Sequence, residues 1–531
     1  MKLLYLNKIS AIVAFTLIYP LNILSADKSS KIIINNNFYM QYNDISGPGK
    51  DNSSLIDGLR YLNIFNLYKK GYIKDYRYSV NLGLKATDNR RKDPKDISIT
   101  NFQISLKNKI NTFKAGDVFQ SFSQYSLTNA LKGVSYRYLD SKRKNQIQLI
   151  YGIAYPRWDS FWDSDTKATK RTVYGARYQK TSTNRLLRTG ISFVYSKDTE
   201  RLYSGIPLYK NYLYTLDVNY FPIPGLWIYG EFSHSQNNRN DSDDTPNKDF
   251  SGNAFKLRAT GDKNPSKVVL EFERVATDFI TLTGSATPDR EKFKATWRYR
   301  INKTVTSHFG FLWYKNNLNH QLDTTTNVYR PSIHIVMRKV FGRKYNNIDL
   351  SYKLDRVTNE NSTTNHIFGI GYSDRYGKVY NTTNIAYNKY KTTNSIQDSH
   401  EIRANTQFSG RIRKNGYVFK PSLSLGTWSN KDELQNTLDK FYEASIGMGV
   451  EVPKHRLTAK FKIGKNKAIR EEADDSTKTF ANLFIYYKPK KLYAFKRSLL
   501  YAKILYNDYS FSTDDNNFRE SSIRVGINIR F

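Results

Sequence analysis

The chain has 531 residues, of which 24% are charged, and its formal net charge at pH 7 is +36. It contains no cysteine, which excludes disulfides, cysteine metal sites, a lipoprotein anchor and covalently attached haem. Aromatic residues nevertheless make up 15% of the sequence, with 41 tyrosines. This combination favours strands with one face against lipid and the other against water over the packed core of a soluble enzyme.

The first 26 residues have the pattern of a secretory signal peptide. Lys2 and Lys8 supply a positive start, a mostly apolar run covers residues 9–24, and Ser25 and Ala26 precede a polar stretch. This order predicts cleavage after Ala26 and export from the cytosol. No later stretch approaches the roughly 20 consecutive apolar residues of a membrane-spanning helix.

From residue 27 to residue 531, apolar and polar residues alternate in one segment after another. A soluble array of β-sandwich domains would share this composition but would need linkers, and we find none. Alternation with a period of two predicts strands, and a charge at every second position suits a wall between lipid and a wet lumen. The basic residues expected to line the lumen are Arg77, Lys85, Lys256, Arg258, Lys294, Arg298, Arg300, Arg456, Lys460 and Lys462.

Residues 116–133 contain the only local family-like motif. The motif begins with Gly116 and Asp117, continues through Phe122 and Tyr125, and ends with Leu131-Lys132-Gly133. It resembles a glycine-aspartate hairpin of fimbrial ushers, over fewer than twenty residues. The separate periplasmic domains of an usher have no counterpart in this chain. The resemblance therefore implies a barrel hairpin and assigns no specific family.

Residues 158–165 combine aromatic and acidic side chains in one polar connection. They read Trp-Asp-Ser-Phe-Trp-Asp-Ser-Asp. The ring faces could bind a sugar and the carboxylates could bind Ca²⁺, but such a loop also packs on its neighbours or contacts lipopolysaccharide. These alternatives stay open at the level of the sequence.

The connections between strands alternate in length. Short ones lie near residues 108–111, 181–184, 302–303, 414–416 and 452–454, and longer polar ones near residues 43–57, 156–170, 197–210, 235–249, 276–291 and 464–476. Barrels have short periplasmic turns and longer extracellular loops. Because residues 118–130 are ambiguous, we predict 24–26 strands, about 26 being the best count. The predicted fold is all-β: a single closed antiparallel transmembrane β-barrel over residues 27–531.

The C-terminal strand has the pattern of a closing barrel strand. One face carries the apolar residues of the last nine positions, and the other carries Arg524, Gly526, Asn528 and Arg530. This pattern resembles the C-terminal signal that the barrel-assembly machinery recognises. The resemblance implies location in the bacterial outer membrane, in contact with lipid and lipopolysaccharide. The residues of the signal are Ile523, Val525, Ile527, Ile529 and Phe531.

The size of such a barrel narrows its function. Twenty-six strands predict a width of about 50 Å between backbones, far wider than porins of 16–18 strands. Inward-folded loops, a flattened wall or a partner protein must fill that space. We therefore predict a wide conduit lined by bases for anionic solutes or polymers, porin-like or exporting, or alternatively a structural sheath around a partner protein in the lumen.

The bases also have a purely structural interpretation, which stays open. Basic turns can sit against anionic lipid, and lumen bases can pair with Glu271, Glu273, Asp349 and Glu443. We expect no enzyme activity, no cofactor and no metal, because the seven histidines have no metal-binding spacing and no nucleophile motif occurs. Export makes a nucleic-acid partner unexpected.

Overall fold

The computed structural model describes residues 31–163, 168–200, 206–242, 246–393, 397–490, 492 and 497–530. The predicted signal peptide and Phe531 lie outside these residues. Within them, no helix is both long enough and apolar enough to cross a membrane.

The described residues form one antiparallel sheet. Its strands are β1 (Lys31–Ser46), β2 (Gly58–Ile73), β3 (Tyr76–Thr87), β4 (Ile97–Lys107), β5 (Asn111–Phe119), β6 (Ala130–Leu139), β7 (Asn145–Ile153), β8 (Arg171–Thr181), β9 (Leu187–Asp198), β10 (Leu208–Tyr220), β11 (Leu226–Asn240), β12 (Lys248–Lys263), β13 (Ser266–Val275), β14 (Arg290–Arg300), β15 (Val305–Lys315), β16 (Asn327–Tyr329), β17 (Ser332–Arg338), β18 (Asn347–Thr358), β19 (Thr363–Tyr376), β20 (Val379–Thr392), β21 (Asp398–Gly410), β22 (Ile412–Lys414), β23 (Tyr417–Asp432), β24 (Thr437–Val452), β25 (Leu457–Ile469), β26 (Ser476–Tyr487), β27 (Arg497–Phe511) and β28 (Phe518–Arg530). Single turns of 3-10 helix are η1 (Lys50–Asn52), η2 (Asp159–Phe161), η4 (Val340–Gly342), η6 (Pro453–His455) and η7 (Asp514–Asn516).

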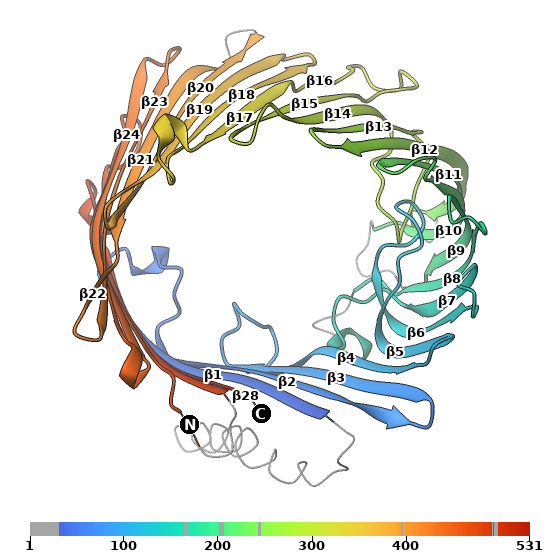
Figure 1. The fold of residues 1–531 in the computed structure, drawn as a ribbon, viewed down its shortest axis with the longest axis horizontal. Helices are drawn as coiled ribbons and strands as arrows, with labels where there is room; N and C mark the ends of the chain where they lie inside the picture. The colour runs from blue at the N-terminus through green and yellow to red at the C-terminus, as the bar shows by residue number, and fades with distance from the viewer. Residues whose placement is uncertain are drawn as a thin grey trace.

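Two wall strands are each interrupted once. Strands β16 and β17 both pair with β15 and β18, and β21 and β22 both pair with β23. Counting each interrupted strand once gives a barrel of 26 strands. The sheet closes because β1 pairs with β28 over residues 35–46, and Figure 1 shows the resulting ring. The prediction of a closed antiparallel barrel of about 26 strands is confirmed.

The predicted alternation in connection length is present over most of the barrel. When each interrupted strand is counted once, the connections after every odd strand gather at one end, which we call the long-loop end, and the others form the short-turn end. The exceptions in length are residues 339–346 and 488–496, which are long connections at the short-turn end, and residues 359–362 and 433–436, which are short ones at the long-loop end. Asn415 and Gly416 connect β22 to β23 with φ angles of 49° and 81°. Positive φ at both central residues is what a tight hairpin requires, so this Asn-Gly pair forms the predicted turn.

The two faces of the wall differ in chemistry. Paired residues share a face, and across β12–β14 one face carries Leu257, Phe272 and Phe293, while the other carries Lys256 and Glu273. Leu257 is 44% exposed, as are many apolar side chains on its face. The polar face is the inner one, because chain segments that fold into the ring contact it. These segments are residues 47–57, 88–96, 120–129 and 276–289 (Figure 1).

Replacing Phe531 with Ser is expected to impair membrane insertion. The described part of the closing strand, β28, pairs with both β27 and β1, and Ile523 and Val525 are 50% and 59% exposed on the outer face. One aromatic side chain contributes only about 2 kcal/mol by burial, so a large loss of insertion would come from recognition during assembly. Heat-modifiable migration of the outer-membrane fraction on gels measures it. Phe309→Ser on the outer face of β15 is the matched control, and equal insertion of both variants would argue against the signal.

Candidate functional site: the lumen wall

The inner wall between β5 and β13 carries a small apolar core that two inward segments cover. Phe122, Tyr125 and Leu127 come from residues 120–129, and Phe279 comes from residues 276–289. Tyr125, Leu127 and Phe279 are fully buried. The wall side of the core consists of Val118, Leu131, Ile150, Val173, Val194, Leu213, Ala254 and Val275. We call residues 120–129 and 276–289 together the inner cover.

Main-chain hydrogen bonds join the two segments of the inner cover. The Thr128 amide donates to the Thr283 carbonyl at 2.8 Å, and the Ser285 amide donates to the Gln124 carbonyl at 2.8 Å. A Cβ atom at Gly284 would lie 1.9 Å from the Tyr125 carbonyl oxygen, so only glycine permits this approach. The cover therefore acts as one unit, although its segments are far apart in the sequence.

Buried carboxylates of the wall hold the cover in place. The Tyr125 amide donates to Glu231 Oε1 at 2.9 Å, and the Tyr125 hydroxyl donates to Glu273 Oε1 at 2.8 Å. Burial raises the pKa of the Tyr125 hydroxyl, and the neighbouring Glu273 carboxylate raises that pKa further. Tyr125 therefore remains a hydrogen-bond donor. Gln124 adds a bond from Nε2 to Glu273 Oε1 at 3.0 Å.

The same carboxylates neutralise lumen bases. Lys256 Nζ lies 3.2 Å from Glu271 Oε2 and donates to Gln124 Oε1 at 2.7 Å. Lys292 lies 3.3 Å from Glu271 and also pairs with Glu273. Pairing and hydrogen bonding make such buried charges tolerable. For Lys256 and Lys292 the structural interpretation of the bases therefore holds.

A further buried ion pair lies on β8 and β10. Arg177 donates from Nη1 and Nη2 to Asp217 at 2.6 and 2.9 Å, and from Nη1 to Ser192 Oγ at 2.9 Å. Both side chains are at most 4% exposed. This bidentate geometry fixes the planar guanidinium, so Arg177 is a fully satisfied wall residue.

Three connections form a hydrogen-bonded rim at the long-loop end. Asp93 accepts from Arg157 Nη2 at 2.8 Å and from Ser98 Oγ at 2.9 Å, and it pairs with Lys85 at 3.2 Å. Arg157 also pairs with the buried Asp159 at 2.6 Å. Arg91 donates to the Leu55 carbonyl at 3.3 Å, which ties residues 47–57 to residues 88–96.

Lowering the pH should loosen this rim only below about pH 4. Burial alone would raise the pKa of Asp93, but hydrogen bonds from Arg157, the Lys95 amide, Ser98 and Lys85 outweigh burial and lower the pKa from 3.8 to about 2. Stability linked to a lowered pKa is complete above the unfolded value of about 3.9 and is lost as the pH falls through about 2. Hydrogen exchange of residues 88–96, corrected for intrinsic rates, measures the loss. Asp93→Asn should flatten the profile, and an unchanged profile in that variant would refute this role of Asp93.

The aromatic and acidic connection at residues 158–163 packs on its neighbours. Trp158 donates to Asp117 Oδ2 at 2.8 Å, and its ring lies 5.9 Å from Phe102 and 5.7 Å from Phe161. Asp163 pairs with Lys95, and Asp165 lies outside the described residues. No group of three or more acidic or histidine side chains in the described ranges is arranged to hold a metal ion.

The predicted lumen bases fall into two groups. Lys85 and Lys256 lie on the inner face and pair with carboxylates, as described above. The rest form no ion pair with a carboxylate in the part of the chain that the structure describes. Arg456 lies in the turn after η6 with φ of 53°, at the short-turn end. The unpaired bases on the inner face of the strands are Arg77, Arg258, Lys294, Arg298, Arg300, Lys460 and Lys462.

Lys460 and Lys462 lie beside a depression of about 490 Å³ in the wall of β20–β26. Its floor includes Gly447 and Gly449, which face Lys462 and Lys460 across β24 and β25. Glycine leaves the space open because no side chain fills it. The lining also includes Arg411, Tyr380, Phe484 and Lys420, and Lys420 pairs with Glu451. This sector combines unpaired charge with room for a ligand.

The sequence did not reveal the inner cover or its anchors. Alternation places Glu231 and Glu273 on the inner face, but nothing local indicates that they bind residues 120–129. The only signal was the irregular pattern of residues 118–130, which marks a segment that is not a regular wall strand. Alternation likewise places Arg177 and Asp217 on the inner face, but it does not indicate that they form an ion pair.

No protein-family model and no curated protein sequence matches the chain. Solved barrel structures do resemble it. The P pilus usher (PapC) translocation pore aligns over 94% of this chain and 99% of its own, with 9% identity and a TM-score of 0.42. The outer membrane transporter YddB from Escherichia coli aligns over 95% and 81%, with 9% identity and a TM-score of 0.43. OpdK of Pseudomonas aeruginosa, solved with vanillate, aligns over 61% and 94%, with 11% identity and a TM-score of 0.28.

Proposed function

We propose that this protein is an outer-membrane conduit for anionic solutes or polymers. The observation that carries the proposal is the set of inner-face bases that form no ion pair with a described carboxylate, on β14 and β25 above all. Arg298 and Arg300 are exposed on β14, and Lys460 is exposed on β25. Unpaired charges of one sign that line a lumen raise the local concentration of counter-ions and select among permeating species.

The outer face supports the proposed location in a membrane. The side chains of Ile191, Ile446 and Val525 are 62%, 64% and 59% exposed on that face. Contact of so much apolar surface with water costs free energy, whereas contact with lipid does not. With this placement, the outer wall would contact lipid and lipopolysaccharide, and the assembly machinery would act on β28. The inner cover and the rim loops narrow part of the lumen.

Efflux from proteoliposomes tests the proposal. Dextran sulfate should leave faster than neutral dextran of the same hydrodynamic radius at low salt. The difference should shrink at 1 M salt, where the screening length falls to about 3 Å. Equal rates at every salt concentration would contradict the conduit. A stoichiometric protein that co-purifies and closes the barrel would instead favour the alternative, a sheath around a partner.

A further inference from the structure

A second group of bases lies on the inner wall of β4–β7. Lys107, Thr112, Arg137 and Gln148 follow one another across the four strands in the strand register. In the neighbouring row, Lys114 stands between Ser105 and Ser135. The register therefore gathers three cations and several neutral hydrogen-bonding groups on one face.

These residues line a polar cavity of about 310 Å³. Its lining includes all three bases, the hydroxyls of Thr112 and Ser135, and Gln120 at the start of the inner cover. No carboxylate lines it. Cavities of this volume fall at the lower end of small-ligand sites, roughly 300–1,000 Å³.

The three bases of the cavity lack protein partners among the described residues. None of the three bases forms an ion pair or a side-chain hydrogen bond with another described residue. Arg177 on β8 is the next residue of the same row, beside Gln148, and its charge is neutralised by Asp217. The three bases of the cavity have no such carboxylate. Neighbouring like charges destabilise a sheet unless something compensates them.

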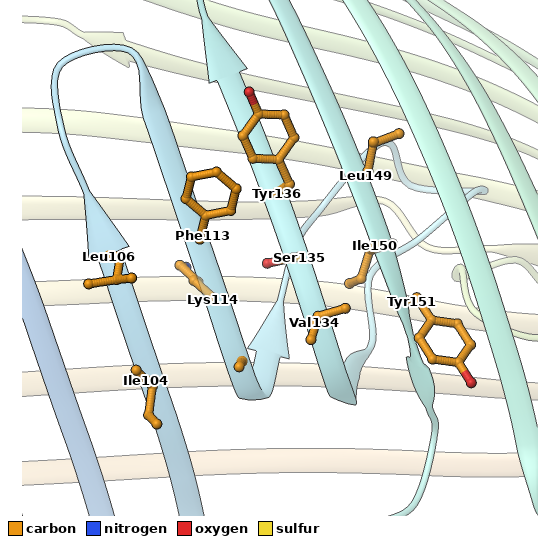
Figure 2. Close-up of a pocket in the computed structure, with 11 residues that line it drawn as sticks. Ile104, Leu106, Phe113, Lys114, Val134, Ser135, Tyr136, Leu149, Ile150 and Tyr151 are labelled. Atoms are coloured by element: carbon orange, nitrogen blue, oxygen red, sulfur yellow. The ribbon is translucent and has the colours of Figure 1, made fainter. Parts of the chain in front are cut away.

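The outer wall cannot supply that compensation. On the same strands Leu106, Phe113, Tyr136 and Leu149 lie side by side on the outer face (Figure 2). Phe113 and Tyr136 stack at 4.7 Å, and the groove they help to line, about 390 Å³, is almost wholly apolar. Any group that neutralises these bases therefore comes from the lumen side.

We propose that this cavity binds a phosphate or sulfate group of a ligand in the lumen. Three cations with adjacent hydroxyls match an oxyanion with several acceptor oxygens, and Arg137 can engage two of them at once. The cavity leaves room for an organic remainder, so an ester fits as well as the bare ion. The group can arrive free in solution or as the headgroup of a lipid.

Isothermal titration of the detergent-solubilised full chain, in buffer without phosphate or sulfate, tests this site. Inorganic phosphate, sulfate and glycerol 1-phosphate are the probes. We expect saturable binding of at least one probe, with affinity at least tenfold lower in Lys114→Gln/Arg137→Gln. Thr112→Val/Ser135→Ala should also weaken binding while the charge stays intact. Heat-modifiable migration on gels verifies that each variant is folded.

Lys303→Gln/Lys378→Gln is the matched control, since it removes the same charge from turns at the short-turn end and should bind as the wild type does. Phospholipid that co-extracts with wild type and control, but not with Lys114→Gln/Arg137→Gln, would identify a headgroup as the source. Equal affinity in all variants, or no saturable binding of any probe together with no such phospholipid, would overturn the site. Because binding needs no passage, failure of this test and failure of the conduit are distinguishable.

Discussion

Replacing Arg298, Arg300, Lys460 and Lys462 with Glu is expected to shift the ion selectivity of the barrel toward cations. Four replacements of two charges each lower the formal net charge from +36 to +28. All four residues lie on the inner face, and none forms an ion pair with a carboxylate among the residues that the structure describes, so the change in charge falls on the lumen. Lumen substitutions tune selectivity, whereas substitutions on the lipid face mainly cost stability.

The zero-current potential in planar bilayers measures this shift. A tenfold KCl gradient gives about 59 mV for perfect selectivity, and the variant should move away from the anion limit by a measurable part of that range. The control replaces Lys109, Lys303, Lys378 and Lys454 with Glu, since these residues lie in turns at the short-turn end and change the net charge equally. A control shift as large as that of the lumen variant would show that position on the wall is irrelevant.

Truncation of Leu127 to Ala is expected to release the inner cover from the wall. Leu127 is fully buried among Phe122, Val118 and the other core residues, and such truncations cost about 2–5 kcal/mol. The cover is anchored by a few hydrogen bonds and this one core, so loss of packing should open the segment locally while the barrel stays closed.

Two readouts follow from release of the cover. Hydrogen exchange of residues 120–129 and 276–289 should rise together, because main-chain bonds join the segments. Single-channel conductance should also increase as the lumen widens. Leu434→Ala, at a side chain that is 44% exposed at the long-loop end, is the control. Exchange that rises in only one of the two segments would refute the cover as a unit.

The wall of this barrel was predictable from sequence, and the contents of its lumen were not. Alternation depends on neighbours two residues apart, so it assigns Phe461 and Lys462 to opposite faces without any tertiary information. The bond from Tyr125 to Glu273 joins residues 148 positions apart, and no local pattern specifies it. Alternation also placed Lys256 and Lys460 on the inner face. It could not predict that Lys256 forms an ion pair with Glu271, whereas Lys460 forms none with a described carboxylate.

The connection at residues 158–163, whose role the sequence left open, illustrates the same limit. The residue types of positions 158–163 suit sugar or calcium binding. In the structure, however, Trp158 donates a hydrogen bond to Asp117, and Asp159 forms an ion pair with Arg157. Conversely, no sequence pattern predicts that Lys107, Lys114 and Arg137 lie close together, because their proximity depends on the register of β4–β6.

The most direct test of the account is the conductance and zero-current potential of the purified wild-type barrel in a KCl gradient. A wide conduit lined by bases should give a large conductance and a potential displaced toward the anion limit, and the displacement should diminish as the ionic strength rises. A barrel that conducts nothing when stripped of other proteins, or that conducts without preference at low salt, would contradict the anionic conduit.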